Sequence, residues 1–267
     1  MIKFEDVVTP SPEQWKATIM GARNPLNSWN RSDSKFHEDI DFDPDNYPCG
    51  FKLGPNDYDL LKRLRNAGTA DHRKFMRMLP VMVTITAPLY WWKEFDAYKV
   101  GTVTNSCSTM HKIADKEFTL EDFSTEHLIV ENDVNHIDMV VWLQKQIDIL
   151  NEWRRTYLDV KDSLTSRDSA KKYWWQMIQL LPSSYNQKRT VMMNYEVLAN
   201  MYKSRKNHKL DEWREHDNID TKTLKRFYDG NYKLRDQKSL NDIGFCDWIK
   251  TLPYAELITG EKGESKK

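Results

Sequence analysis

The chain has 267 residues, 39% of them hydrophobic and 12% aromatic, with 40 basic and 40 acidic side chains. This length allows one large domain with a buried core, and so many aromatic rings exclude a disordered or fibrous chain. The zero net charge argues against a protein that coats nucleic acid, although a local basic pocket remains compatible with it.

The cysteines and the apolar segments bear on where in the cell the protein is expected. Cys49, Cys107 and Cys246 are widely spaced and form no CxxC pair, so neither a disulfide framework nor a zinc ribbon is indicated, and a cytoplasmic location is expected. The N-terminal stretch lacks the apolar core of a signal peptide, and the most apolar region, residues 79–92, is shorter than the ~20 residues that span a bilayer. We therefore expect neither a membrane nor nucleic acid as a partner.

The first half of the chain predicts helices around a loop. Ser11 is expected to cap a helix that has Pro12 at its first position and Gln14 completing a capping box. Residues 26–55 are rich in Asn, Ser, Asp and Pro and predict a long loop. A helix over residues 56–68, ended by Gly68, and a short helix near residues 72–79 are expected to follow.

The middle of the chain predicts a strand and then a helix. Val81, Val83 and Ile85 alternate with more polar positions, which is typical of a strand with one buried face over residues 80–88. The pattern then predicts a helix up to about Tyr98, followed by a loop rich in Thr and Ser.

The second half of the chain is mainly helical in its pattern. Apolar side chains recur every three or four residues over 137–158, which predicts the longest helix. Further helices are expected over 169–182, over 190–208 and near 239–253. This mixed order predicts one α+β domain over residues 1–258 with a flexible tail over 259–267.

The usual catalytic motifs are absent from this sequence. It contains no phosphate-binding P-loop, GxGxxG, HExxH or GxSxG pattern, and its histidines are scattered. The catalytic residues are therefore unknown from motifs, and no metal site is expected.

Two segments have compositions that suit a ligand. Residues 183–189, SSYNQKR, place Lys188 and Arg189 beside hydroxyls and an amide that could hold a phosphate, although the residue types by themselves favour a solvated loop. Residues 101–111 gather small hydroxyl residues around Asn105, which would let a planar ligand approach the backbone; a hairpin with hydroxyl caps is the alternative. Cys107 with His111 is weak evidence for a catalytic thiol.

Several segments, taken in order, resemble the flavin-dependent thymidylate synthases. The similar segments are VTPSPEQWKATIMGAR, LLKRLRNAGTADHRKFMR, VTITAP, the series Tyr185, Asn194, Asn200 and Arg205, and the closing FCDWIKTLPYAEL. The resemblance covers most of the chain except residues 26–55 and 114–165. It implies a curved sheet flanked by long helices, an active site shared between the chains of a homotetramer, and a flavin and a uridylate as ligands.

The resemblance also assigns site residues. It implies that Asn105, Ser108, Asn194, Asn200 and Lys99 contact the cofactor FAD. The substrate, a pyrimidine nucleotide such as dUMP, would meet residues that the resemblance or their chemistry suggests: Glu94, Ser108, Arg205, Lys188, Arg189, Trp91 and Tyr98.

The departures from the family pattern concern its cations. The Arg-His-Arg triplet of the family signature falls on Tyr98-Lys99-Val100, or one residue earlier if the alignment starts from Ala87-Pro88. The signature's Glu falls on Ser106 and its final Arg-Tyr on Met110-His111. An Arg of the flavin-binding helix is replaced by Glu196. Because Arg offers a fixed fork of donors to phosphates and carbonyls, Lys is a poor substitute for it.

Three hypotheses follow for the function. The first is a divergent enzyme that methylates dUMP with FAD, folate and NADPH. The second is a non-catalytic protein that binds or sequesters a nucleotide or a nucleotide signal, with aromatic rings stacking on the base and cations meeting the phosphates. The third is a structural protein that retains only the fold and buries its aromatic residues as core. The helix at 137–158 is a candidate for packing between subunits.

Overall fold

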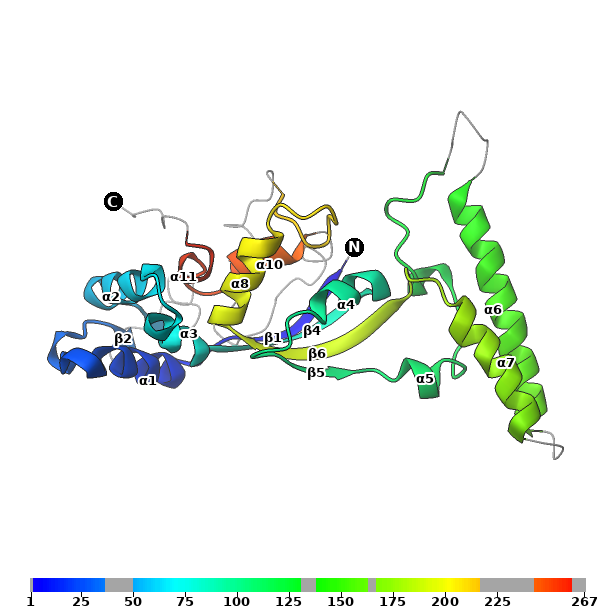
Figure 1. Ribbon diagram of the computed structural model, residues 1–267, viewed down its shortest axis with the longest axis horizontal. Coiled ribbons are helices and arrows are strands. Elements are labelled where there is room, and N and C mark those ends of the chain that lie inside the picture. The colour runs from blue at the N-terminus through cyan, green and yellow to red at the C-terminus, as the bar shows by residue number, and fades with distance from the viewer. Residues whose placement is uncertain (1, 37–49, 131–137, 163–166, 217–242, 261–267) are drawn as a thin grey trace. The chain divides into compact units, whose positions relative to one another are not determined.

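The computed structural model describes residues 2–36, 50–130, 138–162, 167–216 and 243–260. Four strands form one sheet in the order β1 (Lys3–Val8), β4 (Pro80–Pro88), β6 (Asn186–Asn194), β5 (Val103–Ser106). A second sheet pairs β2 (Lys35–Phe36) with β3 (Phe51–Lys52) in antiparallel register, Phe36 opposite Phe51. The expected α+β class is confirmed (Figure 1).

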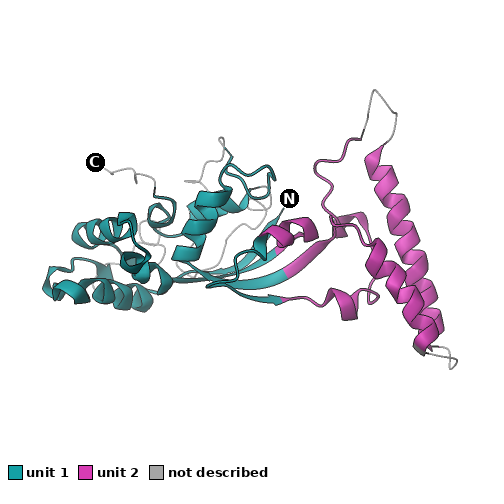
Figure 2. Ribbon diagram, in the orientation of Figure 1, with its two compact units in different colours: residues 1–85, 95–105, 189–267 teal, residues 86–94, 106–188 magenta. Residues whose placement is uncertain are grey.

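The chain forms two compact units (Figure 2). Unit 1 comprises residues 1–85, 95–105 and 189–267, and unit 2 comprises residues 86–94 and 106–188. The single domain expected over residues 1–258 stays a prediction.

Unit 1 carries most of the shorter helices. They are α1 (Pro12–Arg23), α2 (Pro55–Asn66), α3 (Lys74–Arg77), α8 (Tyr195–Arg205), α10 (Phe245–Thr251) and α11 (Glu256–Thr259), with the 3-10 turns η1 (Asn24–Leu26), η2 (Trp29–Arg31) and η4 (Ala70–Arg73). The predicted capping box of α1 is confirmed, since Ser11 N donates to Gln14 Oε1 at 2.8 Å and Ser11 Oγ accepts from Gln14 N. The expected helices near residues 56–68 and 72–79 are confirmed. The helix expected near 239–253 is confirmed over Phe245–Thr251, while residues 239–242 and the tail beyond residue 260 lie outside the described residues.

The long loop expected over residues 26–55 is only partly described. Its described ends contain two 3-10 turns and the short β2–β3 pair, while residues 37–49, with Cys49, lie outside the described residues.

Unit 1 has an aromatic core. Phe4 of β1 stacks on Trp248 of α10 with ring centroids 5.0 Å apart, and Phe245 packs against Trp248 and Trp213 at 5.3 and 5.0 Å. All four rings are buried. Aromatic side chains of this size supply much of the hydrophobic stabilisation of a core, and here they join the first strand to one of the last helices.

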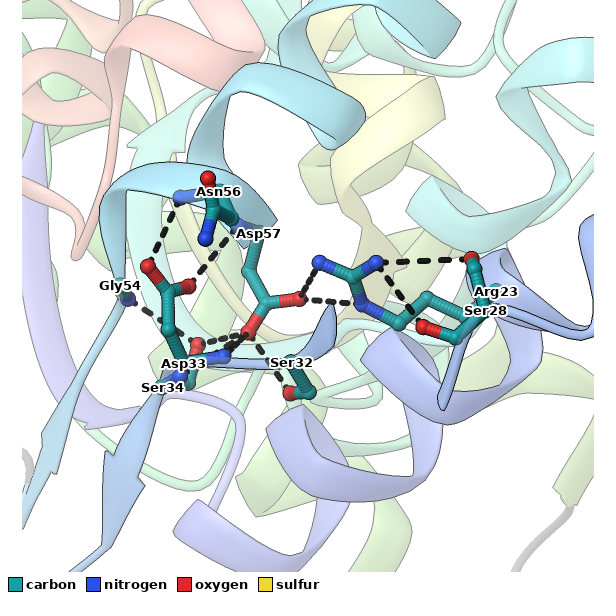
Figure 3. A network of polar contacts seen from close by, with 8 residues as sticks. All are labelled: Arg23, Ser28, Ser32, Asp33, Ser34, Gly54, Asn56 and Asp57. Carbon is teal, nitrogen blue, oxygen red and sulfur yellow. Dashed lines mark hydrogen bonds and ion pairs between the residues drawn. The ribbon is translucent and has the colours of Figure 1, made fainter. Parts of the chain in front are cut away.

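A buried polar network ties the segment after α1 to α2 (Figure 3). Asp57 Oδ1 accepts from Arg23 Nε at 2.6 Å, while Oδ2 accepts from the hydroxyls of Ser32 and Ser34 and from two backbone N–H groups. Asp33 in turn accepts from Asp57 N at 3.1 Å. Buried charges are tolerated when every lone pair has a donor, so this network fixes residues 28–34 on α2.

Unit 2 is built on two long helices that pack side by side, α6 (Met139–Asp162) and α7 (Arg167–Leu180) (Figure 1). The helix predicted over 137–158 is confirmed from residue 139 onward, and Ile137 lies outside the described residues. Leu143, Ile147 and Leu150 of α6 form the core with Met177 of α7 and with Phe118 and Phe123. The unit also contains α5 (Thr109–Lys112), the 3-10 turn η5 (Leu120–Asp122) and most of α4 (Leu89–Phe95).

Three sequence predictions were wrong in part, because each predicted a helix or a loop where the structure has a strand. The helix predicted over 190–208 begins only at Tyr195, because residues 190–194 belong to β6, where Val191 and Met193 are buried and Met192 is exposed. The strand alternates with period two, but Met193, Val197 and Met201 recur every fourth residue across the strand–helix junction and so imitate a helical stripe. The phosphate loop at 183–189 likewise ends in β6, and the hydroxyl-rich loop contains β5 and α5.

Among the helices that the structure describes, none is both long and apolar enough to cross a bilayer.

Candidate functional site

A pocket of about 350 Å³ lies on unit 1, next to the end of α4. Its lining residues are Phe95, Asp96, Tyr98, Lys99, Thr102 and Thr104. The pocket therefore combines two aromatic rings, one carboxylate, one ammonium group and two hydroxyls. Pockets for small ligands typically have volumes of about 300–1,000 Å³, so this one lies at the lower end of that size range, with a lining that is more polar than usual.

The ring of Tyr98 is held in the pocket by Arg205 of α8. Arg205 Nε donates to Tyr98 Oη at 2.9 Å, and the guanidinium carbon lies 5.5 Å from the centroid of the Tyr98 ring and 5.3 Å from that of Trp213. Both distances fall within the ~6 Å range of cation–π attraction. The structure thus brings together two predicted site residues, Tyr98 and Arg205, and adds Trp213, which the sequence did not single out.

Of the two charged residues that line the pocket, one is in an ion pair with a described residue and the other is not. Arg189 Nη1 lies 2.8 Å from Asp96 Oδ1, and the Arg189 side chain is 14% exposed. The carboxylate of Asp96 is thereby neutralised by a cation that we predicted for a phosphate. Lys99 is exposed and has no ion pair within the described part of the chain, so its ammonium group is available to an anion.

The predicted flavin residue Asn194 caps α8. Its Oδ1 accepts from Val197 N at 3.0 Å, and the preceding backbone enters the helix with Tyr195 N donating to Leu79 O at 3.1 Å. Gly101 packs against this turn with a φ of +79°, and a Cβ there would lie 2.8 Å from Val197 Cγ2 and 3.3 Å from Asn194 Nδ2. Asn194 therefore has a structural role that explains its presence without a ligand.

The first turn of α8 also carries an ion cluster that the sequence did not reveal. Glu196 pairs with Arg77 of α3, and Glu196 Oε1 lies 3.9 Å from Nε of Arg73. Of these three residues, the sequence analysis singled out only Glu196, which stands where the family has an Arg. Arg73 and Arg77 come from a segment more than a hundred residues earlier, so their proximity to Glu196 had no local pattern.

The remaining predicted residues of unit 1 lie at the surface. Asn105 is exposed on β5, and Asn200 is exposed on α8. Neither position shows a feature that assigns it a ligand, and both stay predictions.

Four predicted residues belong to unit 2. Trp91 is fully buried, edge-on to Trp92 with centroids 4.8 Å apart, and Trp92 Nε1 donates to Gln187 O at 2.9 Å. This burial supports the packing interpretation of both tryptophans. Glu94 is half-buried on α4, Ser108 caps α5 by accepting from His111 N at 3.2 Å, and Lys188 is exposed on β6.

Cys107 is exposed, and its backbone is fixed by its neighbours on β6. Its N–H donates to Lys188 O at 3.0 Å, and its carbonyl accepts from Gln187 Nε2 at 3.3 Å. Within the described residues its thiol has no base beside it, which supports the non-catalytic alternative.

Comparison with known proteins identifies the fold. No family model matches the chain, and no curated protein is significantly similar to it in sequence. Among solved structures, the chain is similar to thymidylate synthase X (ThyX) from Helicobacter pylori with FAD and dUMP, at a TM-score of 0.51 and 13% identity over 97% of both chains. It is also similar to the UMP/dUMP methylase PolB from Streptomyces cacaoi bound with 5-Br dUMP, at a TM-score of 0.50 and 14% identity over 97% of this chain and 94% of that one.

The chain therefore has the fold of the flavin-dependent thymidylate synthases, and the resemblance seen in the sequence is confirmed at the level of the fold. At 13–14% identity the match carries the scaffold and not the chemistry, because function depends on the site that a fold presents.

Proposed function

We propose that this protein binds a pyrimidine nucleoside monophosphate in the pocket beside Tyr98, on a scaffold of the flavin-dependent thymidylate synthase type. The observation that carries the proposal is the pairing of a positioned aromatic ring, Tyr98, with an ammonium group without an ion pair, Lys99, in one pocket. The two solved structures of the same fold hold dUMP and its bromo analogue, which favours a pyrimidine monophosphate over other nucleotides.

Each wall of the pocket has a role in this proposal. The Tyr98 ring stacks on the base, since its orientation is fixed by the Arg205 hydrogen bond. Lys99 meets the phosphate by charge-assisted hydrogen bonds. Thr102 donates to the Tyr98 carbonyl, which leaves its oxygen as an acceptor, and Thr104 offers a second hydroxyl. Arg205 acts on the nucleotide through Tyr98.

The residues of this pocket do not fit FAD. A dinucleotide such as FAD needs a larger volume than the ~350 Å³ of this pocket, which lies at the lower end of the range for small-ligand pockets. Its pyrophosphate also needs more than one cation. Here Lys99 stands alone, because Arg189 is paired with Asp96. We therefore derive no reaction step through a flavin, and nucleotide binding without methyl transfer is the function that we propose. The flavin, folate and NADPH of a methylating enzyme belong to the alternative.

Calorimetric titration with dUMP, UMP, dTMP, dCMP and dAMP tests the proposal. We expect the uridine nucleotides to bind and to raise thermal stability by RT ln(1 + [L]/Kd). Lys99→Gln should weaken binding by about 10- to 100-fold, the equivalent of ~1.5–3 kcal/mol for a lost charged hydrogen bond. Lys203→Gln, at an exposed position of α8 outside the pocket, is the matched control. Failure of every pyrimidine nucleotide to bind would contradict the proposal.

The enzymatic alternative has a separate test. Protein supplied with FAD, methylenetetrahydrofolate and NADPH should release no tritium from 5-labelled dUMP if the protein only binds. Release of tritium at a rate above the protein-free control would favour the divergent enzyme instead.

We also propose a homo-oligomer, with a homotetramer as the specific expectation. The support comes from α6, where Val141, Trp142 and Ile149 are 51%, 50% and 47% exposed. Apolar side chains gathered on one exposed element commonly mark an interaction surface.

A further inference from the structure

The start of α8 already has acceptors from its own chain. A helix N-terminus attracts phosphates because its first N–H groups lack partners and carry the positive end of the helix dipole. In α8, Tyr195 N donates to Leu79 O at 3.1 Å and Val197 N donates to Asn194 Oδ1 at 3.0 Å. Two of the first three N–H groups are therefore used before any ligand arrives.

Glu196 adds a negative charge between these two donors. Its carboxylate belongs to the first turn of the helix, and its side chain is only 13% exposed. A carboxylate at this position interacts favourably with the helix dipole, as a bound anion would. It would also repel a phosphate brought to the same turn.

The nearby cations are directed at Glu196. Arg77 Nε pairs with Oε2, and the contact raises the pKa of the Arg77 guanidinium through the hydrogen bond and the charge of Glu196. Arg73 Nε lies 3.9 Å from Oε1, close enough for an ion pair but too far for a hydrogen bond. The carboxylate thus occupies the point at which two guanidinium groups would otherwise hold an anion.

The backbone at Gly101 closes one side of the same turn. With a Cβ at this glycine lying 2.8 Å from Val197 Cγ2, the loop and the helix are already in contact. No ligand can pass between them at that point.

We propose that Glu196 is a built-in anion that excludes phosphate groups, and hence flavin phosphates, from the start of α8. The resemblance in sequence implied an Arg at this position and flavin contacts at Asn194. The structure instead shows Asn194 acting as a cap and Glu196 neutralising two arginines. This inference is independent of the nucleotide pocket, which lies in another set of residues.

Titrations with FAD and with inorganic phosphate at low ionic strength test the role of Glu196, since salt screens such contacts. Wild-type protein should bind neither at this turn. Glu196→Gln frees Arg73 and Arg77 and should raise the affinity for phosphate, and for FAD through its phosphates, at least tenfold. Adding Arg73→Gln to Glu196→Gln should remove most of the gain. Glu152→Gln, at an exposed position on α6, is the matched control and should behave as wild type.

Two outcomes would overturn the proposal. One is stoichiometric FAD binding by the wild-type protein with an affinity that Glu196→Gln leaves unchanged. The other is a folded Glu196→Gln variant that binds phosphate no better than wild type. If Glu196→Gln does not fold, Glu196→Ala, which also removes the carboxylate, takes its place in the same titrations and the same two outcomes apply. Binding of dUMP should respond to Lys99→Gln and not to Glu196→Gln, which separates this proposal from the nucleotide pocket.

Discussion

Arg23 and Asp57 form a buried ion pair in which Nε and Nη2 of the arginine both lie 2.6 Å from Oδ1 of the aspartate, with the two side chains 4% and 0% exposed (Figure 3). They are 34 residues apart in sequence. The other oxygen of Asp57 accepts from Ser32 and Ser34, so the network holds α1, α2 and residues 32–34 in one arrangement.

Replacing Asp57 with Asn should destabilise the protein strongly. The substitution leaves the Arg23 charge buried without its partner, and breaking such a pair typically costs about 3–5 kcal/mol. Chemical denaturation measures the loss. Asp59→Asn is the matched control, because its pair with Arg63 is 66% exposed on the aspartate side and such pairs contribute ~0–1 kcal/mol. Equal effects of the two substitutions would show that the buried network contributes little.

Stability should fall in acid because of the same carboxylate. Burial raises the pKa of Asp57, but hydrogen bonds from Ser34, Ser32 and Arg23 outweigh burial and lower the pKa below its usual value. For Glu215, hydrogen bonds from Lys250 and Tyr202 outweigh burial in the same way and lower its pKa.

A group with a depressed pKa in the folded state stabilises the protein fully above its unfolded pKa, ~3.9 for Asp and ~4.3 for Glu, and this contribution is lost as the pH falls through the folded value. Denaturation midpoints measured from pH 6 downward should therefore decline from about pH 4. The decline should be shallower in Asp57→Asn, and an identical slope in the variant would contradict the assignment.

Substitution by alanine should change the stability of the protein differently at two glycines. At Gly101 the φ of +79° and the 2.8 Å approach to Val197 Cγ2 make a side chain strained, so Gly101→Ala should cost about 1–3 kcal/mol. At Gly68 a Cβ would meet nothing within 4 Å, and φ is not positive. Gly68→Ala should be neutral or stabilise by ~0.4–1 kcal/mol through the unfolded state. Thermal denaturation of both variants compares their stabilities. Equal stabilities of Gly101→Ala and Gly68→Ala would show that residues 95–104 are not packed on α8.

A charge on the exposed face of α6 should disrupt the proposed assembly. Trp142 is 50% exposed, so Trp142→Glu should fold normally yet place a carboxylate in any interface that buries this face. Light scattering coupled to gel filtration should then show a smaller species than wild type. Lys203→Gln, at an exposed position of α8 in unit 1 and not on α6, should leave the mass unchanged. A wild-type protein that is already monomeric would contradict the assembly itself.

Much of the secondary structure was decided locally. The capping box at Ser11 and the apolar period of α6 appear in the sequence and in the structure at the same places, because capping and periodicity depend on neighbours within one or two turns. The order of these elements, with Asn194, Asn200 and Arg205 at their spacing, was enough to predict the fold of the flavin-dependent thymidylate synthases.

The candidate site was decided by tertiary contacts. The sequence predicted a ligand contact for Arg205, which stays a prediction, and the structure adds its contacts with Tyr98 and Trp213. It predicted Arg189 for a phosphate, and the structure pairs Arg189 with Asp96. The sequence showed only that Glu196 replaces the family's arginine, and the structure shows that it pairs with Arg77 of α3. Charge pairing acts over a few ångströms between residues distant in the chain, so the sequence by itself determined which charged groups exist, and only the folded chain decided which of them are neutralised and which can meet a ligand.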